Sequence, residues 1–211
     1  MEKLLRKGAE ADIYVGDWYG DEVIRKIRKP KTFMHPKLDA ELRRHRTVIE
    51  ALSLSQAKDA GVSTPYLYYV DPGRGEIIME YVHGERFKDL LARQPLGKLI
   101  PLCVELGRCV ARLHAANLMH GDLSTSNFLV TGDSLTFIDF GLSFISPKLE
   151  DRAVDLHLVK EVLRSAHGNV WEEVFRFILK GYEEVSGEKQ VAALTAKIRE
   201  IERRGRYARV E

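Results

Sequence analysis

The sequence predicts an α+β protein with two lobes, a small β-rich lobe followed by a reduced helical lobe. The first observation is a change of pattern, because short β-rich runs come first and stretches with apolar residues at helical spacing follow. The second is length, since 211 residues suit one domain or one two-lobed domain. We therefore expect a single domain with a first lobe at 1–82, a connector at 83–86, a second lobe at 87–202 and a basic C-terminal tail at 203–211.

The first lobe is expected to hold strands around one helix. Its β-rich runs, bounded by turn-forming residues, lie at 12–16, 22–27, 66–70 and 76–82. Residues 36–60 contain neither Gly nor Pro after Pro36, and their apolar residues have helical spacing. We expect a helix there that ends at Gly61, because a glycine followed by Pro65 disfavours its continuation.

The second lobe is expected to be mainly helical, with helices at 98–118, 152–166, 169–185 and 188–204. Between the first two of these helices lies a loop-and-strand region that carries many polar residues. Cys103 and Cys109 lie six residues apart in the first helix and so point to different faces, which disfavours a disulfide. We interpret them as buried thiols of a protein that resides in the reducing cytoplasm.

Composition excludes several classes of protein. Apolar residues make up 45% of the chain and charged residues 30%, which is typical of globular domains and unlike disordered chains. The 33 Lys and Arg nearly balance the 31 Asp and Glu, so any surface for nucleic acid must be local. There is no run of about 18 apolar residues, so we expect neither a membrane-spanning helix nor a membrane partner.

The residues that carry chemistry are concentrated at 120–141. His120, Asp122 and Asn127 precede two short strands, and the D-F-G string that begins at Asp139 follows them. A hairpin of this size would bring the two carboxylates and the amide to one end, where their oxygens suit Mg²⁺. This order, H-x-D-x-x-x-x-N and then D-F-G, is typical of phosphoryl transfer by protein kinases. We expect Asn127 and Asp139 to bind the metal and Asp122 to orient the attacking hydroxyl; the alternative is that all of them are ordinary turn residues.

A strand lysine and a helix glutamate are needed to complete this layout. Lys26 lies on the second β-rich run, and we expect it to reach the nucleotide phosphates. Its neighbour Arg25 is the alternative, but the period of two along a strand points it to the other face. We expect Glu50 to hold Lys26, with Glu41, near the basic start of the helix, as the alternative.

Two further segments are expected to bind the nucleotide. The loop that covers the phosphates is predicted at Gly8, Ala9, Glu10 and Ala11. It has one glycine where protein kinases carry G-x-G-x-x-G. Glu80 and Val82 are expected to bind adenine through their backbone, with Met79 beside the pocket; the alternative is that this segment is a plain edge strand.

These motifs resemble those of the PRPK-like family, the small atypical serine/threonine protein kinase subunits of the KEOPS (EKC) complex. The resemblance covers nearly the whole chain and includes K-G-A-E-A at 7–11, H-G-D-L-S-T-S-N at 120–127, I-D-F-G-L-S at 138–143 and R-G-R at 204–206. It implies a bilobal protein-kinase-like fold, ATP and Mg²⁺ as cofactors, and protein kinase or ATPase activity. It also implies partners, namely other KEOPS subunits and the universal protein that makes threonylcarbamoyl-adenosine (t6A) at tRNA position 37.

Gly121 and Ser124 distinguish the chain from a signalling kinase. Gly121 stands where many kinases carry the Arg that pairs with a phosphorylated activation loop, which argues against activation by loop phosphorylation. Ser124 stands where a typical catalytic loop carries a lysine that neutralises phosphate charge. Asp155 is expected to be a buried anchor of the catalytic loop rather than a catalyst.

Two basic segments are candidates for binding tRNA. Nine Lys or Arg lie between Arg25 and Arg46, against two acidic residues. Four arginines lie in the tail at 203–209, which we expect to be mobile unless bound. The alternatives are that both segments are solvated surface, or that the tail folds toward the ATP site or docks a partner.

Two other functions remain open. A small-molecule kinase of the aminoglycoside or choline type also uses H-G-D-x-x-x-x-N, but it needs a helical substrate-binding insert for which this chain is too short. A scaffold that binds nucleotide without turnover is the second, but it has no physical need to keep Lys26, Asp122, Asn127 and Asp139 together.

Overall fold

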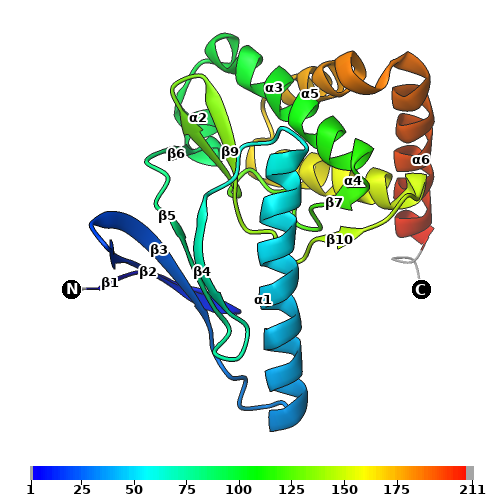
Figure 1. The fold of residues 1–211 in the computed structure, drawn as a ribbon. Coiled ribbons are helices and arrows are strands. Elements are labelled where there is room, and N and C mark those ends of the chain that lie inside the picture. The colour runs from blue at the N-terminus through cyan, green and yellow to red at the C-terminus, as the bar shows by residue number, and fades with distance from the viewer. Residues whose placement is uncertain (1, 208–211) are drawn as a thin grey trace.

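The computed structural model of the chain, which describes residues 2–207, has two lobes that meet near residue 82 (Figure 1). The first lobe contains β1 (Lys3–Lys7), β2 (Ala11–Trp18), β3 (Asp21–Arg28), α1 (Pro36–Asp59), β4 (Leu67–Asp71) and β5 (Glu76–Glu80). The second contains β6 (Glu85–Arg86), α2 (Phe87–Arg93), α3 (Leu96–Ala115), β7 (Leu118–Met119), β8 (Phe128–Thr131), β9 (Ser134–Phe137), β10 (Phe144–Ile145), α4 (Leu149–Ala166), α5 (Trp171–Ser186) and α6 (Glu188–Tyr207). The predicted bilobal α+β fold is confirmed.

The first lobe is an antiparallel sheet with the strand order β1-β2-β3-β5-β4. β3 lies in the middle of this sheet, where Lys26 pairs with Ile13 on one side and Ile77 on the other. Tyr19 and Gly20, both with positive φ, make the turn that joins β2 to β3. The central position of β3 fixes the direction of its side chains, because both neighbouring strands hold its backbone.

Helix α1 runs along the sheet and reaches the second lobe, so it touches both halves of the molecule (Figure 1). It begins at Pro36, where a proline costs no intrahelical hydrogen bond. It ends as the sequence predicts, because Gly61 adopts a φ of 76° and its N–H donates to the carbonyl of Lys58. Because α1 contacts both lobes, its side chains can reach the space between them.

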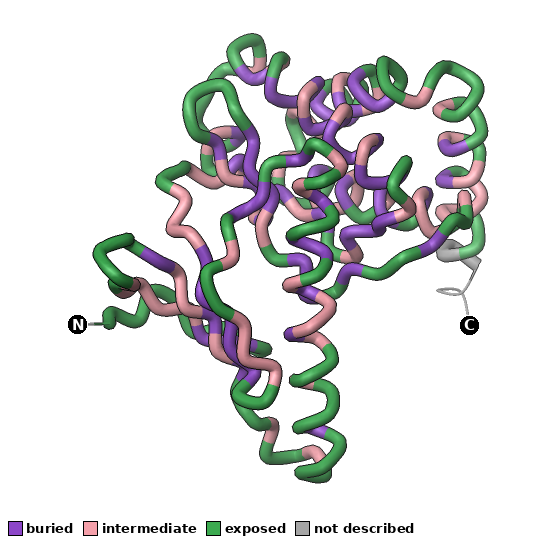
Figure 2. The backbone as a smooth tube through the Cα atoms, viewed as in Figure 1, coloured by how far each residue is buried: buried purple, intermediate pink, exposed green. Residues whose placement is uncertain are grey.

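The core of the second lobe takes most of its residues from α3, which packs against α5, and further ones from β8, β9, α4 and α6. Buried backbone runs through this lobe in Figure 2. Two glycines let α3 and α5 approach closely. A Cβ on Gly107 would lie 1.9 Å from the carbonyl oxygen of Ile178, and a Cβ on Gly181 would lie 1.8 Å from that of Val104. No side chain fits at either position, so the glycines set the distance between the helices.

Three differences from the sequence-based expectation are local. α3 ends at Ala115 rather than 118, because Asn117 takes a φ of 59° and β7 begins at Leu118. The short helix α2 was not predicted. The last helix, expected to end at 204, continues to Tyr207 as α6, so the first residues of the expected tail at 203–211 are helical; Arg209 lies outside the described residues.

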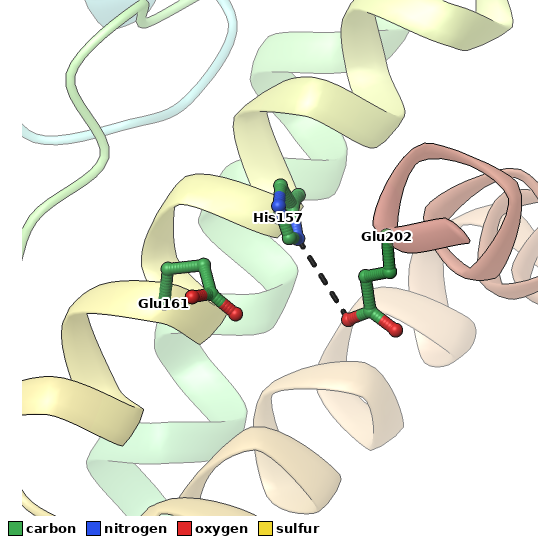
Figure 3. Close-up of side chains that lie close together, drawn as sticks. All are labelled: His157, Glu161 and Glu202. Carbon is green, nitrogen blue, oxygen red and sulfur yellow. Dashed lines mark ion pairs between the residues drawn. The ribbon is translucent and has the colours of Figure 1, made fainter. Parts of the chain in front are cut away.

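A cluster of titratable side chains joins α4 to α6 (Figure 3). Ligand atoms of His157, Glu161 and Glu202 lie within 4.8 Å of one another, a spacing that could hold a metal ion. However, Lys160 Nζ lies 2.5 Å from Glu202 Oε1 and already supplies a cation there. We interpret the cluster as an ion-pair network that fastens α6 to α4. None of the helices in the described part of the chain is long and apolar enough to cross a bilayer.

Candidate active site

A cavity of about 410 Å³ lies between the two lobes. Its walls come from β1, β2, β3, α1, β5, the connector and the segments at 126–129 and 138–139. Of the residues expected to bind a nucleotide or metal, it is lined by Lys26, Glu50, Met79, Glu80, Val82, Asn127 and Asp139. The volume falls in the range of small-molecule sites, about 300–1,000 Å³.

Lys26 joins both lobes at the inner end of this cavity. Its Nζ lies 2.7 Å from Glu50 Oε1 on α1 and 2.6 Å from Asp139 Oδ1 in the second lobe. Burial opposes the charged form of Lys26, but the two carboxylates outweigh it and raise the pKa of Lys26 above its ordinary value. The lysine is thus a fixed cation facing the cavity.

Arg25 and Glu41, the alternatives to Lys26 and Glu50, do not line the cavity. Arg25 points away from the cavity, and its guanidinium pairs with Glu2 at 2.9 Å and with Glu76. Glu41 is exposed on α1, whereas Glu50 is completely buried. The structure therefore pairs Lys26 with Glu50, the two residues that the sequence pattern favoured.

Asp122 and Asn127 lie side by side at the end of the β8–β9 hairpin. Asn127 Nδ2 donates to the backbone oxygen and to Oδ2 of Asp122, both at 2.9 Å. With its amide nitrogen committed in this way, Asn127 keeps its side-chain oxygen for another partner. The carboxylate of Asp122 is exposed. The backbone N–H of Ile138 donates to the Asn127 carbonyl at 2.9 Å, which fixes the following segment beside this loop.

Asp139 adopts a φ of 64°, a strained conformation that turns its side chain toward the cavity. Burial raises the pKa of Asp139, but the ammonium of Lys26 outweighs it and holds this pKa below the ordinary value. Half of the side chain is exposed. An ionised carboxylate on Asp139 and a free amide oxygen on Asn127 are the hard oxygen donors that Mg²⁺ prefers, so the donor set fits this metal.

Asp155 of α4 anchors the segment that begins at His120. Asp155 Oδ2 accepts from the backbone N–H of His120 at 2.7 Å, and Oδ1 accepts from that of Gly121 at 2.8 Å. His114 Nε2 lies 3.3 Å from the same carboxylate, which is almost fully buried. Asp155 is therefore an anchor, as expected, and its position away from the cavity excludes direct contact with a bound substrate.

The residues expected to cover the phosphates, Gly8, Ala9, Glu10 and Ala11, are not in the lining of the cavity. The N–H of Gly8 donates to the carbonyl of Ala11 at 3.0 Å, and a Cβ on Gly8 would lie 2.4 Å from that oxygen. This turn requires glycine at its first position. Ala9 and Glu10 are exposed, and Glu10 forms an ion pair with Arg46 of α1.

The connector residues line the outer part of the cavity. The N–H of Glu80 donates to the Tyr66 carbonyl at 2.8 Å, and the Glu80 carboxylate accepts from the Tyr66 N–H at 3.0 Å, so both groups are committed within the lobe. The N–H of Val82 has no acceptor among the described residues. Val82 can therefore offer a donor to a ligand, and Met79 is a buried wall.

Sequence reasoning missed two arginines that line the cavity. Arg6 is on β1, and Arg86 pairs in register with Leu129 on β8. A signal existed for Arg6, which lies two residues before Gly8. None existed for Arg86, because the pairing of a two-residue strand cannot be read from the sequence.

Comparisons with known proteins agree with this geometry. Residues 21–162 match the RIO domain family. The chain is 43% identical to the KEOPS complex subunit Bud32 of Pyrococcus abyssi, covering 97% of this chain and 96% of that protein. It is 38% identical to the EKC/KEOPS complex subunit bud32 of Dictyostelium discoideum, covering 96% and 82%. A probable bifunctional tRNA threonylcarbamoyladenosine biosynthesis protein of Methanothermobacter thermautotrophicus is 44% identical over 97% of this chain, which spans 36% of that longer protein.

Among solved structures, the chain resembles a Rio2 kinase from Chaetomium thermophilum in an ADP/Mg²⁺-phosphoaspartate complex, with a TM-score of 0.63. The sequence identity is 19%, and the alignment covers 92% of this chain and 69% of that one, so the likeness concerns the fold alone. The fold is that of a RIO-type atypical kinase. The chain belongs to the family of Bud32 subunits of the KEOPS complex.

Proposed function

We propose that the chain is an ATP- and Mg²⁺-dependent serine/threonine protein kinase or ATPase that acts in t6A modification of tRNA. The observation that carries this proposal is the contact of Lys26 with both Glu50 and Asp139 in a cavity that is also lined by Asn127, the hydrogen-bond partner of Asp122. A buried lysine fixed between carboxylates from two lobes is the arrangement that positions a nucleotide triphosphate for transfer.

Each residue has a definite task in this proposal. The carbonyl of Glu80 and the backbone of Val82 bind adenine beside Met79, and Lys26 binds the phosphates under the loop at 8–11. Asn127 and Asp139 would hold Mg²⁺, which neutralises phosphate charge when bound. Asp122, exposed and hydrogen-bonded to Asn127, orients the hydroxyl that attacks, from a serine, a threonine or a water molecule.

The proposed partners are other KEOPS subunits and the universal t6A-modifying protein. The names of the relatives support this, because two of them are KEOPS or EKC/KEOPS subunits. A third is a bifunctional t6A biosynthesis protein of which a region like this chain forms about a third. Fusion of the two parts in one polypeptide favours a shared process. We expect this process in the cytoplasm, where tRNA is modified.

We further propose that tRNA contacts the basic part of the first lobe and the C-terminal segment. Several of the cations counted in the sequence are balanced within the lobe, such as Lys29 by Asp12 and Arg46 by Glu10. Lys37 and Arg44 are exposed on α1 and are the better candidates for phosphate contacts.

The test is to follow ATP turnover by the purified chain alone, with the t6A-modifying partner, and with partner and tRNA. We expect Mg²⁺-dependent turnover that the partner and tRNA change. Phosphate release that is the same in EDTA as in Mg²⁺, or no nucleotide binding under any of these conditions, would contradict the proposed function.

A further inference from the structure

A second buried cation, Arg28, forms an ion pair with Glu50, the same glutamate that Lys26 contacts. Arg28 lies on β3 two residues after Lys26, so the pleat of the strand aims both side chains at α1. Its Nη2 pairs with Glu50 Oε2, while Lys26 holds Oε1 of the same carboxylate. Its Nη1 donates to Thr47 Oγ1 at 3.2 Å, one turn earlier on α1.

The backbone around Arg28 is fixed as firmly as its side chain. Its N–H donates to the carbonyl of Gly75 at 2.9 Å, and a Cβ on Gly75 would lie 3.3 Å from the Cβ of Arg28. The turn between β4 and β5 therefore packs directly against Arg28. With 3% of its surface exposed, Arg28 has little freedom to move.

Arg28 also touches the D-F-G segment of the second lobe. A Cβ placed on Gly141 would lie 3.1 Å from Arg28 Nη2 and 3.6 Å from Glu50 Oε2. The guanidinium thus lies against the backbone of this glycine, and a side chain at this position would force it to shift by a few tenths of an ångström. One arginine joins β3, α1 and the loop that carries Asp139.

The buried ion pair of Arg28 and Glu50 is not expected to add much to the stability of the fold. Arg28 Nε is buried without a hydrogen-bond partner in the described part of the chain, which costs free energy. Buried ion pairs are weak contributors to stability compared with apolar residues of similar size. The formal charges of Lys26, Arg28, Glu50 and Asp139 cancel, which makes the four residues a balanced unit around the cavity.

We propose that Arg28 is a positioning residue that locks Glu50 of α1 onto Lys26, so that the phosphate-binding lysine is held in place without phosphorylation of an activation loop. This inference rests on the proposed function and deepens it. Gly121, which replaces the arginine that reads a phosphorylated loop, agrees with such a permanent lock. Arg28 acts through Glu50 and does not line the cavity itself.

The test is a double-mutant cycle on ATP turnover with Arg28→Met, Glu50→Gln and the double variant, with the melting temperature of each recorded. We expect R28M to lower turnover at saturating ATP by about tenfold or more. In the E50Q background the same change should lower turnover by less than about threefold, because residues that act as one unit are not additive. Arg25→Gln, on the same strand but facing away, is the matched control and should stay within about threefold of the wild-type rate.

Two results would overturn the proposal. One is an R28M variant with wild-type turnover, and the other is an equal fold-loss for R28M in the wild-type and E50Q backgrounds, which would mean a role independent of Glu50. If R28M does not fold, Arg28→Lys replaces it, because lysine keeps the charge but cannot bridge Glu50 and Thr47. Reduced turnover by R28K at an unchanged melting temperature supports the lock, and full turnover refutes it. Failure of the proposed function is distinguishable, because wild type would then show no more turnover than Lys26→Gln.

Discussion

Replacement of Lys26 by glutamine should strongly reduce ATP turnover while leaving the fold nearly intact. The variant loses the charge behind two contacts, at 2.7 Å to Glu50 and 2.6 Å to Asp139. Glu50 keeps Arg28 as a counter-ion, and Asp139 can be solvated because half of its side chain is exposed. We therefore expect a loss of about 1–2 kcal/mol in the free energy of unfolding, since no carboxylate is left buried and unpaired.

The effect on turnover should be larger than the effect on stability. A charge-assisted contact to the phosphates is worth about 1.5–3 kcal/mol, which corresponds to a roughly 10- to 150-fold loss of rate. The assay is phosphate release from ATP with Mg²⁺, beside urea unfolding of both proteins. Arg25→Gln is the control, because it also replaces a strand cation by glutamine, one residue earlier. Its side-chain amide keeps an N–H donor for the buried Glu76. Equal losses in the two variants, or a larger loss for R25Q, would refute the assignment of Lys26.

Further outcomes are expected from changes elsewhere in the chain. Asp139→Asn should abolish Mg²⁺-dependent ATP turnover and lower the melting temperature only slightly, because half of the side chain that pairs with Lys26 is exposed; retained turnover would exclude Asp139 as a metal ligand. Because Lys26 holds the pKa of Asp139 below its ordinary value, this carboxylate adds stability that is complete above about pH 5 and is lost as the pH falls through its folded pKa, so acid unfolding of wild type should be steeper than that of D139N. Gly181→Ala should lower the free energy of unfolding by about 1–3 kcal/mol or more, measured in urea, because its Cβ would lie 1.8 Å from the Val104 carbonyl oxygen; a neutral effect would contradict the close helix contact. Truncation after Glu202 should leave ATP turnover of the isolated chain unchanged and lower the slope of log tRNA affinity against log salt by about 2–3; an unchanged slope would leave this segment without a role in binding.

Much of the site could be predicted because its residues follow local rules. The period of two on a strand separates Lys26 from Arg25, and the place of Glu50 in its helix favours it over Glu41. The same period could have identified Arg28, which shares a strand face with Lys26, but nothing in the sequence shows that one glutamate takes two cations. That fact depends on the distance between β3 and α1, which tertiary packing sets.

Other features depended on contacts between distant segments. Arg86 enters the cavity because a two-residue strand pairs with β8, and such short pairings carry no pattern of their own. The sequence predicts that the last helix ends at 204, whereas α6 continues to Tyr207. Arg204 pairs with Glu150 of α4 at 2.8 Å and with Glu200 at 3.1 Å, and the sequence alone does not show the contact with the other helix.

A crystal structure of the chain with ADP and Mg²⁺ would test the proposed nucleotide site most directly. We expect adenine against the backbone of Glu80 and Val82, the phosphates at Lys26, and the metal on Asn127 and Asp139. A nucleotide bound outside the cavity between the lobes, or a metal that neither Asn127 nor Asp139 touches, would contradict the proposed site.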